Sequence, residues 1–269
     1  MWGLIANRVK QGFRTLSYPK EVPSFPRRFR GRPTLCVRET PVSIDAAKDP
    51  LGAIVLTGTI GTSVPPVPGG TGQKPAVDMG KLLFHEDIKA ISSSEFLRYS
   101  HDHRMAVSKR EDLILGEDGI KLAAALDEKM KKIFGRSLKL RQVCAGGCNG
   151  CEGEIQAMGN VVFDLSRFGI QFVASPRHAD GLMIAGPVTK NMELALKKTY
   201  EAVPHPKIVI AVGACAISGG PFQGGREVHN GVDGLIPVDL YVPGCPPHPL
   251  TIIDGLLRLL DKLGHEEKR

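Results

Sequence analysis

The sequence predicts an α/β fold, an open parallel sheet in the C-terminal half of the chain. In that half, short apolar runs alternate with helical stretches, and glycine-rich loops follow the apolar runs. The predicted strands are residues 138–143, 170–174, 181–185, 208–212 and 240–242, and the predicted helices are 154–168, 190–202 and 249–263. Ligands of such sheets bind outside the carboxyl ends of the strands.

The first 35 residues form a basic arm. Trp2, Ile5, Val9 and Phe13 recur at helical spacing with basic residues between them, which predicts a short amphipathic helix. Such a helix docks on an anionic membrane surface or a partner subunit, or packs on its own chain. Four spaced prolines between residues 19 and 33 then favour an extended path.

Two regions separate this arm from the sheet. Residues 36–110 have weak periodicity and predict an irregular α+β region, in which 58–74 is a long loop rich in Gly, Pro and Thr. Residues 111–136 show helical apolar spacing up to Phe134 and predict a helical linker. The sheet domain is therefore expected over 137–269.

Charge and hydropathy exclude several classes of protein. The chain has 269 residues and a net charge of +7, and residues 1–35 hold eight basic side chains against one acidic side chain, so the remainder is neutral. A uniformly basic nucleic-acid binder is disfavoured, and no nucleic-acid partner is expected. No apolar run is long enough to span a bilayer, and no secretory signal is recognisable. The six cysteines therefore indicate a reducing compartment and metal or redox chemistry.

Four cysteines follow the predicted strands in glycine-rich loops. Cys148 and Cys151 follow the first strand, Cys215 the fourth and Cys245 the fifth. Four thiolates suit a tetrahedral zinc or a [4Fe–4S] cluster. Structural zinc usually takes two tight C-x2-C pairs, and only one pair is tight here, so the spacing favours the cluster and leaves a zinc-stabilised assembly module as the alternative.

Cys144 precedes this set and completes the three-cysteine spacing of radical S-adenosylmethionine enzymes with Cys148 and Cys151. Those enzymes need most of a barrel after the motif, and only 118 residues follow Cys151. That interpretation would also leave Cys215 and Cys245 without a role, so it ranks third.

The cysteine motifs resemble a known family. Residues 148–154 (Cys-Asn-Gly-Cys-Glu-Gly-Glu), 212–220 (Val-Gly-Ala-Cys-Ala-Ile-Ser-Gly-Gly) and 243–247 (Pro-Gly-Cys-Pro-Pro) are similar to the small subunit of membrane-bound [NiFe] hydrogenases of the energy-converting type. This family is related to the B subunit of respiratory complex I. Residues 175–180 and 186–189 also match, so the resemblance covers about 131–269.

The resemblance implies a flavodoxin-like fold and one [4Fe–4S] cluster bound by Cys148, Cys151, Cys215 and Cys245. The complex I branch has two adjacent cysteines where this chain has C-x2-C, which favours the hydrogenase side. Cys144 departs from the family pattern and is expected to be a spare thiol, while Cys36 has no assigned role. Glu152 and Glu154 could serve a proton path or simply favour the helix N-terminus.

A second resemblance concerns the N-terminal half. The proline-rich arm is similar to the N-terminus of the two-cluster ferredoxin subunit of the same complexes, and residues 49–54 then fall on that family's Cys-Pro-x-Gly-Ala-Ile. The ligand positions of the first motif hold Glu39, Val42, Asp45 and Asp49. Those of the second hold Leu82, His85, Ile88 and Ser92. We therefore expect a degenerate ferredoxin-like region that lacks clusters, fused to the sheet domain.

Together these observations predict an electron-transfer subunit of a membrane-associated oxidoreductase, with no catalytic centre of its own. The resemblance implies as partners a large catalytic subunit of the [NiFe] hydrogenase or complex I type, a ferredoxin-type subunit and membrane subunits. It also implies a cytoplasmic position, peripheral on the inner face of the cell membrane through the complex. A complex I-type subunit that passes electrons to quinone is the alternative within the same fold.

Overall fold

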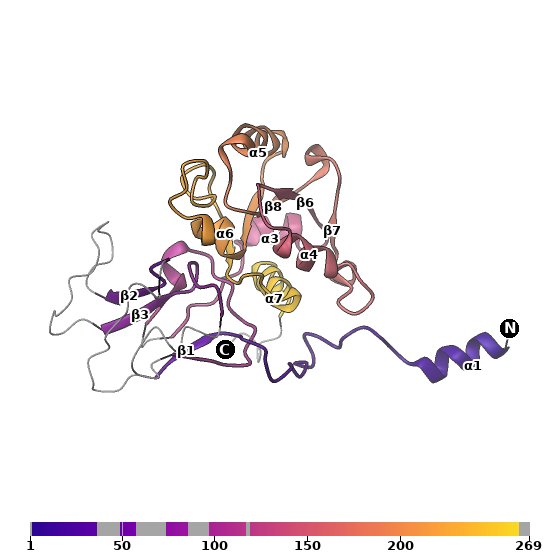
Figure 1. Ribbon diagram of the computed structural model, residues 1–269. Coiled ribbons are helices and arrows are strands. Elements are labelled where there is room, and N and C mark those ends of the chain that lie inside the picture. The colour runs from indigo at the N-terminus through magenta and orange to yellow at the C-terminus, as the bar shows by residue number, and fades with distance from the viewer. Residues whose placement is uncertain are drawn as a thin grey trace.

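The structure is a computed structural model that describes residues 2–36, 49, 51–57, 74–85, 97–116 and 119–263. Its C-terminal part holds a sheet of five strands, β6 (Leu138–Cys144), β7 (Ile170–Phe172), β8 (Gly181–Ala185), β9 (Ile208–Val212) and β10 (Leu240–Val242). They lie in the order β10-β9-β8-β6-β7, and all neighbours are parallel (Figure 1). This is the 2-1-3-4-5 order of flavodoxin-like folds, so the predicted fold class is confirmed.

Helices cover both faces of this sheet. They are α4 (Gly150–Ala157), α5 (Lys190–Ala202), α6 (Gly213–Ser218) and α7 (Pro249–Leu259). Side chains of α4 and α7 join the core on one face, with Leu138, Ile208 and Leu240. Side chains of α5 and α6 join the core on the other face, with Leu182, Val209 and Tyr241. Consecutive residues of each strand thus belong to opposite cores, which explains their continuous apolar runs.

The helix expected over 154–168 is wrong in its bounds. Helix α4 begins at Gly150 and ends at Ala157, and only a 3-10 turn, Leu165–Phe168, occupies the end of the expected range. Between them, the Asn160 side chain accepts hydrogen bonds from the amides of Val162 and Phe163. Such side-chain bonding favours a turn over a helix.

The N-terminal half contributes small antiparallel sheets. One pairs β1 (Pro33–Leu35) with β4 (Leu97–Tyr99), and the other has the order β2-β3-β5, formed by β2 (Ile54–Thr57), β3 (Lys74–Asp78) and β5 (Ile114–Leu115). Between them lies a third, smaller core that includes Leu82, Leu97 and Met105. The described part of this half is irregular, as expected.

The helical linker predicted over 111–136 is also wrong in most of its length. Only α3 (Glu128–Phe134) is an α-helix, and the side chain of Asp127 caps it by accepting from the Met130 amide. Residues 110–113 form a 3-10 turn, and 114–115 pair with β3. The apolar residues at 113, 115, 120 and 122 fit a period of two as well as a helix, and tertiary pairing with the sheet selects the extended form.

Three of the positions aligned with ferredoxin ligands are described. Asp49 accepts hydrogen bonds from the amides of Ala53 and Ile54 at 3.0 and 2.8 Å, so its carboxylate organises the turn before β2. Leu82 is buried in the small core, and the backbone carbonyl of His85 accepts from the Tyr99 hydroxyl. The remaining aligned positions lie outside the described residues: Glu39, Val42, Asp45, Ile88 and Ser92.

The arm runs from the free helix α1 (Trp2–Gln11) along the sheet domain (Figure 1). The Thr15 hydroxyl donates to the Val161 carbonyl, the Leu16 amide donates to Val162, and Arg167 donates to the carbonyls of Leu16 and Tyr18. Within the part of the chain that the structure describes, no helix has the length and apolar character needed to cross a bilayer.

Candidate metal centre

The four predicted ligand cysteines meet at the carboxyl edge of the parallel sheet. Cys148 lies in the loop after β6, and Cys151 lies in the first turn of α4. Cys215 lies in α6 directly after β9, and Cys245 lies in the loop after β10. The Ala214 amide donates to the Gly244 carbonyl at 2.8 Å, which ties the last two loops together.

Glycines give the cysteine sulfurs the space that side chains would fill. A Cβ on Gly213 would lie 2.5 Å from Sγ of Cys151, and a Cβ on Gly220 would lie 2.8 Å from Sγ of Cys215. Both glycines have positive φ, +86° and +52°, a conformation that other residues rarely adopt. These two positions therefore form a cradle around the sulfurs that only glycine allows.

The cysteines share one electrostatic environment. Burial, and then the charges of Cys215, Cys245, Glu152 and Cys148, raise the pKa of the Cys151 thiol. Burial, followed by Cys245 and Cys148, raises the pKa of Cys215 to about 12. Four groups that act on one another in this way belong to a single site.

The site is open on one side. Cys148 is exposed and Cys151 and Cys245 are half-buried, whereas Cys215 is only 7% exposed. Among the described residues, no group of three or more His, Cys, Asp or Glu side chains is arranged to hold a single metal ion. Cys144 is exposed at the end of β6, and Cys36 lies far along the sequence, beside β1.

The two glutamates of α4 differ in environment. Glu152 is 4% exposed, and its Oε1 has no hydrogen-bond partner among the described atoms. This oxygen lies 3.0 Å from where a Cβ on Gly147 would be, so the carboxylate faces the loop that carries Cys148. Burial raises the pKa of Glu154, which lines a cavity beside Cys245.

The comparisons with known proteins agree with the cysteine motifs. Residues 148–259 match the family described as NADH ubiquinone oxidoreductase, 20 kDa subunit. A Pyrococcus furiosus protein named as a probable membrane-bound hydrogenase subunit is 46% identical over 132 residues, which is 49% of this chain and 79% of the relative. The chain belongs to the 20 kDa subunit family.

A second relative of this 20 kDa subunit family member is the NADH-quinone oxidoreductase B subunit of Geotalea daltonii. It is 53% identical over 116 residues, which is 43% of this chain and 68% of the relative. Among solved structures, a chain of the membrane-bound sulfane sulfur reductase, an archaeal respiratory membrane complex, aligns with a TM-score of 0.45 and 34% identity, over 54% of this chain and 82% of that chain. The predicted resemblance is thus confirmed for the sheet domain, which contains the whole family match.

In this family member, the N-terminal half also lines the site, a feature that sequence reasoning missed. A cavity of about 320 Å³ lies beside Cys245, and both halves of the chain line it. Its lining residues are Arg28, Phe29, Arg30, Phe84, Met105, Glu154, Gly244, Cys245, Pro246, Pro247, His248 and Thr251. No periodicity or motif could have revealed a contact between segments more than 200 positions apart.

Aromatic rings join the arm to the Cys245 loop. The ring centroids of Phe25 and Phe29 lie 5.3 and 5.5 Å from that of His248, and Phe163 lies 5.8 Å from it. The Nδ1 atom of His248 accepts from the Leu250 amide at the start of α7. Burial, followed by the charge of His103, lowers the pKa of His248 to about 4, so the ring is neutral near pH 7.

The loop around Gly80 contacts the other side of the site. The Ser218 hydroxyl, at the end of α6, donates to the Gly80 carbonyl at 2.8 Å. A Cβ on Gly80 would lie 2.7 Å from Cγ2 of Ile217, so this loop packs closely on the helix that carries Cys215. The 20 kDa subunit fold therefore has N-terminal segments against two of its cysteine loops.

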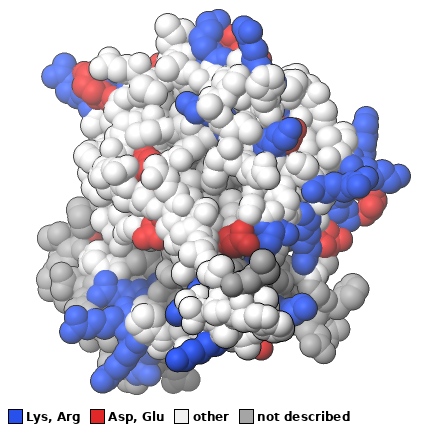
Figure 2. Space-filling view, turned by 90° about the vertical axis from the view of Figure 1, so that its right-hand side faces the viewer, with Lys and Arg blue, Asp and Glu red and all other residues white. Residues whose placement is uncertain are grey.

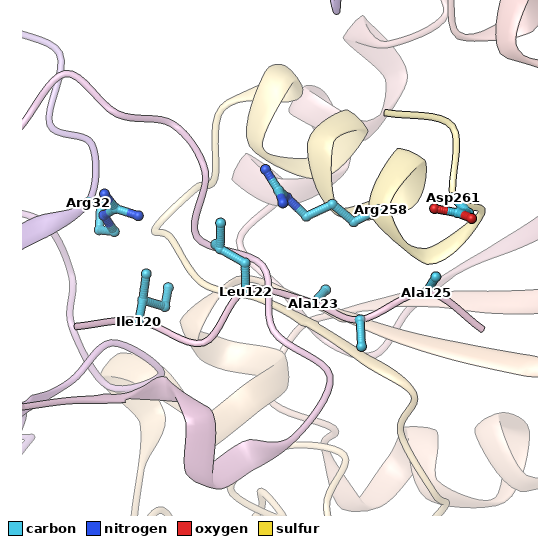
Figure 3. Close-up of a pocket in the computed structure, with 8 residues that line it drawn as sticks. Arg32, Ile120, Leu122, Ala123, Ala125, Arg258 and Asp261 are labelled. Atoms are coloured by element: carbon cyan, nitrogen blue, oxygen red, sulfur yellow. The ribbon is translucent and has the colours of Figure 1, made fainter. Parts of the chain in front are cut away.

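A second cavity, of about 340 Å³, lies between residues 120–125 and α7 (Figure 3). Arg32 and Arg258 face it from different segments, and Asp261 lies at its far end (Figure 3). None of the four cysteines lines this cavity, so it is separate from the candidate metal centre.

Proposed function

We propose that the chain is an electron-transfer subunit that holds one [4Fe–4S] cluster through Cys148, Cys151, Cys215 and Cys245. The complex is a membrane-associated [NiFe] hydrogenase or a related oxidoreductase. The observation that carries the proposal is the meeting of these four cysteines, from three separate loops, at one edge of the sheet within a glycine cradle.

The donor set fits an iron–sulfur cluster better than zinc. A structural zinc usually gathers its four thiolates from two tight C-x2-C pairs around one ion, at about 2.3 Å. Here Cys148 and Cys151 form one tight pair, whereas Cys215 and Cys245 stand alone on the loops after β9 and β10. A cubane binds each thiolate through a different iron and so suits ligands that come from separate loops. This arrangement supports the cluster over the zinc-stabilised assembly module.

When bound, the cluster supplies one-electron exchange without the making or breaking of substrate bonds. The chain's own residues then have three tasks. The cysteines hold the ligand sulfurs on three loops, Gly213 and Gly220 leave the space for close approach, and Cys215 anchors the buried side of the site. Exposed Cys148 marks the open side, where we place the contact with a large catalytic subunit.

The partners follow from the same family. We infer a large catalytic subunit, a ferredoxin-type subunit and membrane subunits, with the chain on the inner face of the cell membrane. The C-x2-C spacing of Cys148 and Cys151 favours the hydrogenase branch, whereas the NADH-quinone oxidoreductase relatives favour a quinone-reducing complex. Nickel in the co-purified large subunit distinguishes the two: one nickel supports the hydrogenase, and its absence together with quinone reduction supports the alternative.

Low-temperature EPR of the anaerobically purified, dithionite-reduced chain tests the cluster. We expect a single spin-one-half signal in the wild type, its loss in Cys215→Ser, and its retention in the matched control Cys144→Ser. An EPR-silent wild type with stoichiometric zinc contradicts the proposal, and an unchanged signal in Cys215→Ser contradicts the ligand assignment.

A further inference from the structure

Helix α1 leaves its apolar side chains in contact with solvent. None of its ten residues is buried, and Trp2, Ile5 and Val9 are 85%, 51% and 77% exposed. Phe13, just beyond the helix, is 91% exposed. Figure 1 shows α1 at the end of the arm, away from the folded body. The sequence left packing on its own chain open, and the structure shows no such packing.

The exposed apolar residues form one stripe. At 3.6 residues per turn, Trp2, Ile5, Ala6 and Val9 share one side of α1, while its polar residues lie on the remaining surface. Leu4 is the exception, because it lies on the polar side although it is 77% exposed. The chain therefore provides two apolar residues of similar size, Ile5 and Leu4, on opposite sides of one helix.

The charge around this stripe is positive. Residues 1–35 carry the whole net charge of +7, and the only acid among them is Glu21. Five of the basic residues in α1 and the following arm are exposed: Arg8, Lys10, Arg14, Arg27 and Arg28. In Figure 2, which faces this side of the molecule, basic side chains gather along the lower edge with little acidic surface among them.

The arm fixes where α1 leaves the body. The Thr15 hydroxyl donates to the Val161 carbonyl at 2.8 Å, and the Leu16 amide donates to the Val162 carbonyl at 2.9 Å. Val161 is itself 65% exposed. The helix is thus tethered within four residues of an anchored segment, beside a further exposed apolar side chain.

We propose that α1 lies flat on an anionic lipid bilayer, with Trp2, Ile5 and Val9 inserted at the headgroup boundary and Arg8 and Lys10 near the phosphates. A helix of ten residues is about 15 Å long, half the thickness of the hydrocarbon core, so it can lie in the interface but cannot span it. Tryptophan favours this interface, and basic side chains add attraction to anionic lipid. The surplus of positive charge selects a negatively charged lipid surface rather than an apolar protein groove.

Trp2 provides the probe, because it is the only tryptophan of the chain. The full-length purified chain is titrated with vesicles of phosphatidylcholine that contain phosphatidylglycerol, and with vesicles of phosphatidylcholine alone. We expect a blue shift of Trp2 emission with the anionic vesicles, quenching by brominated lipid chains, and reversal at high salt. This readout does not depend on iron, so its failure is distinct from a failure of the proposed cluster.

Matched variants separate insertion from charge. Ile5→Ser removes an apolar side chain from the stripe and should weaken vesicle binding by about tenfold, whereas Leu4→Ser on the polar side should weaken it by less than about threefold. Arg8→Gln and Lys10→Gln should each weaken binding by about fivefold at low salt. Equal losses for Ile5→Ser and Leu4→Ser overturn the proposal. So does a Trp2 emission that ignores anionic vesicles and shifts only when partner subunits are added, which assigns the helix to a protein surface.

Discussion

The hydroxyl of Tyr18 in the N-terminal arm donates a 2.8 Å hydrogen bond to Oδ1 of Asp254 in α7, 236 positions later. Oδ2 of Asp254 accepts from Nε of Arg258 at 2.7 Å, and Nε2 of His103 lies 3.3 Å from the Tyr18 hydroxyl. All four side chains are buried. A buried polar network of this kind joins the arm, the N-terminal half and the sheet domain into one structure.

Replacing Tyr18 with Phe should lower the free energy of unfolding by about 1–2 kcal/mol. The ring stays, but the buried Asp254 and His103 each lose a hydrogen-bond partner. Urea denaturation measures the change, and limited proteolysis should release the arm more quickly. Tyr200→Phe is the control, because that ring in α5 packs 3.9 Å from Nζ of Lys207 and keeps the contact without its hydroxyl. Equal stability of Tyr18→Phe and the wild type would show that the network does not hold the arm.

Replacing Gly213 with Ala should prevent cluster assembly. The new methyl would lie 2.5 Å from Sγ of Cys151, at a φ of +86° that costs alanine about 1–3 kcal/mol. The measurement is iron per chain after anaerobic purification, together with thermal unfolding. Gly153→Ala is the matched control in α4, because a Cβ there meets nothing within 4 Å. We expect this control to keep its iron and to be stabilised by about 0.5 kcal/mol. Full iron content in Gly213→Ala would contradict the cradle.

Acid should destabilise the chain through His248. Its folded pKa, lowered by burial to about 4, lies below the unfolded value of about 6.5. The unfolded state therefore binds more protons between these values, and the free energy of unfolding should fall as the pH decreases from 6.5 to 4. Burial also lowers the pKa of His103, which adds to the same trend.

Urea denaturation across this pH range tests the prediction with His248→Asn. Asparagine keeps a side-chain acceptor at the start of α7 but does not titrate. We expect a shallower fall in stability than in the wild type, whereas His178→Asn, at an exposed site, should leave the pH dependence unchanged. A His248→Asn variant with the wild-type slope would rule out the neutral buried ring as its source.

The strands were the most predictable part of the fold. Residues 181–185, 208–212 and 240–242 are strands with the expected bounds, because a strand buried on both faces has an uninterrupted apolar run. Helix α6 was not predicted, since its six residues are too few for a periodic pattern and include a glycine. The linker helix failed because Leu113 and Leu115 fit two periods, and only the pairing with β3 decides between them.

The candidate site was predictable for a different reason. Cys148, Cys215 and Cys245 each follow a strand that the apolar runs identify, and parallel strands bring their carboxyl ends to one edge. Its surroundings were not predictable, because Phe25 meets His248 only through tertiary packing of the arm. The same holds for Gly80 and Ile217, whose close contact no local pattern encodes.

The central claim is one [4Fe–4S] cluster on four cysteines, and the iron and acid-labile sulfide content of the anaerobically reconstituted chain tests it most directly. The account predicts about four irons and four sulfides per chain, unchanged in Cys36→Ser and Cys144→Ser and lost in Cys151→Ser or Cys245→Ser. A content near twelve irons would mean that the ferredoxin-like region holds clusters after all. Zinc in place of iron, or full iron in the Cys151 and Cys245 variants, would contradict the assigned centre itself.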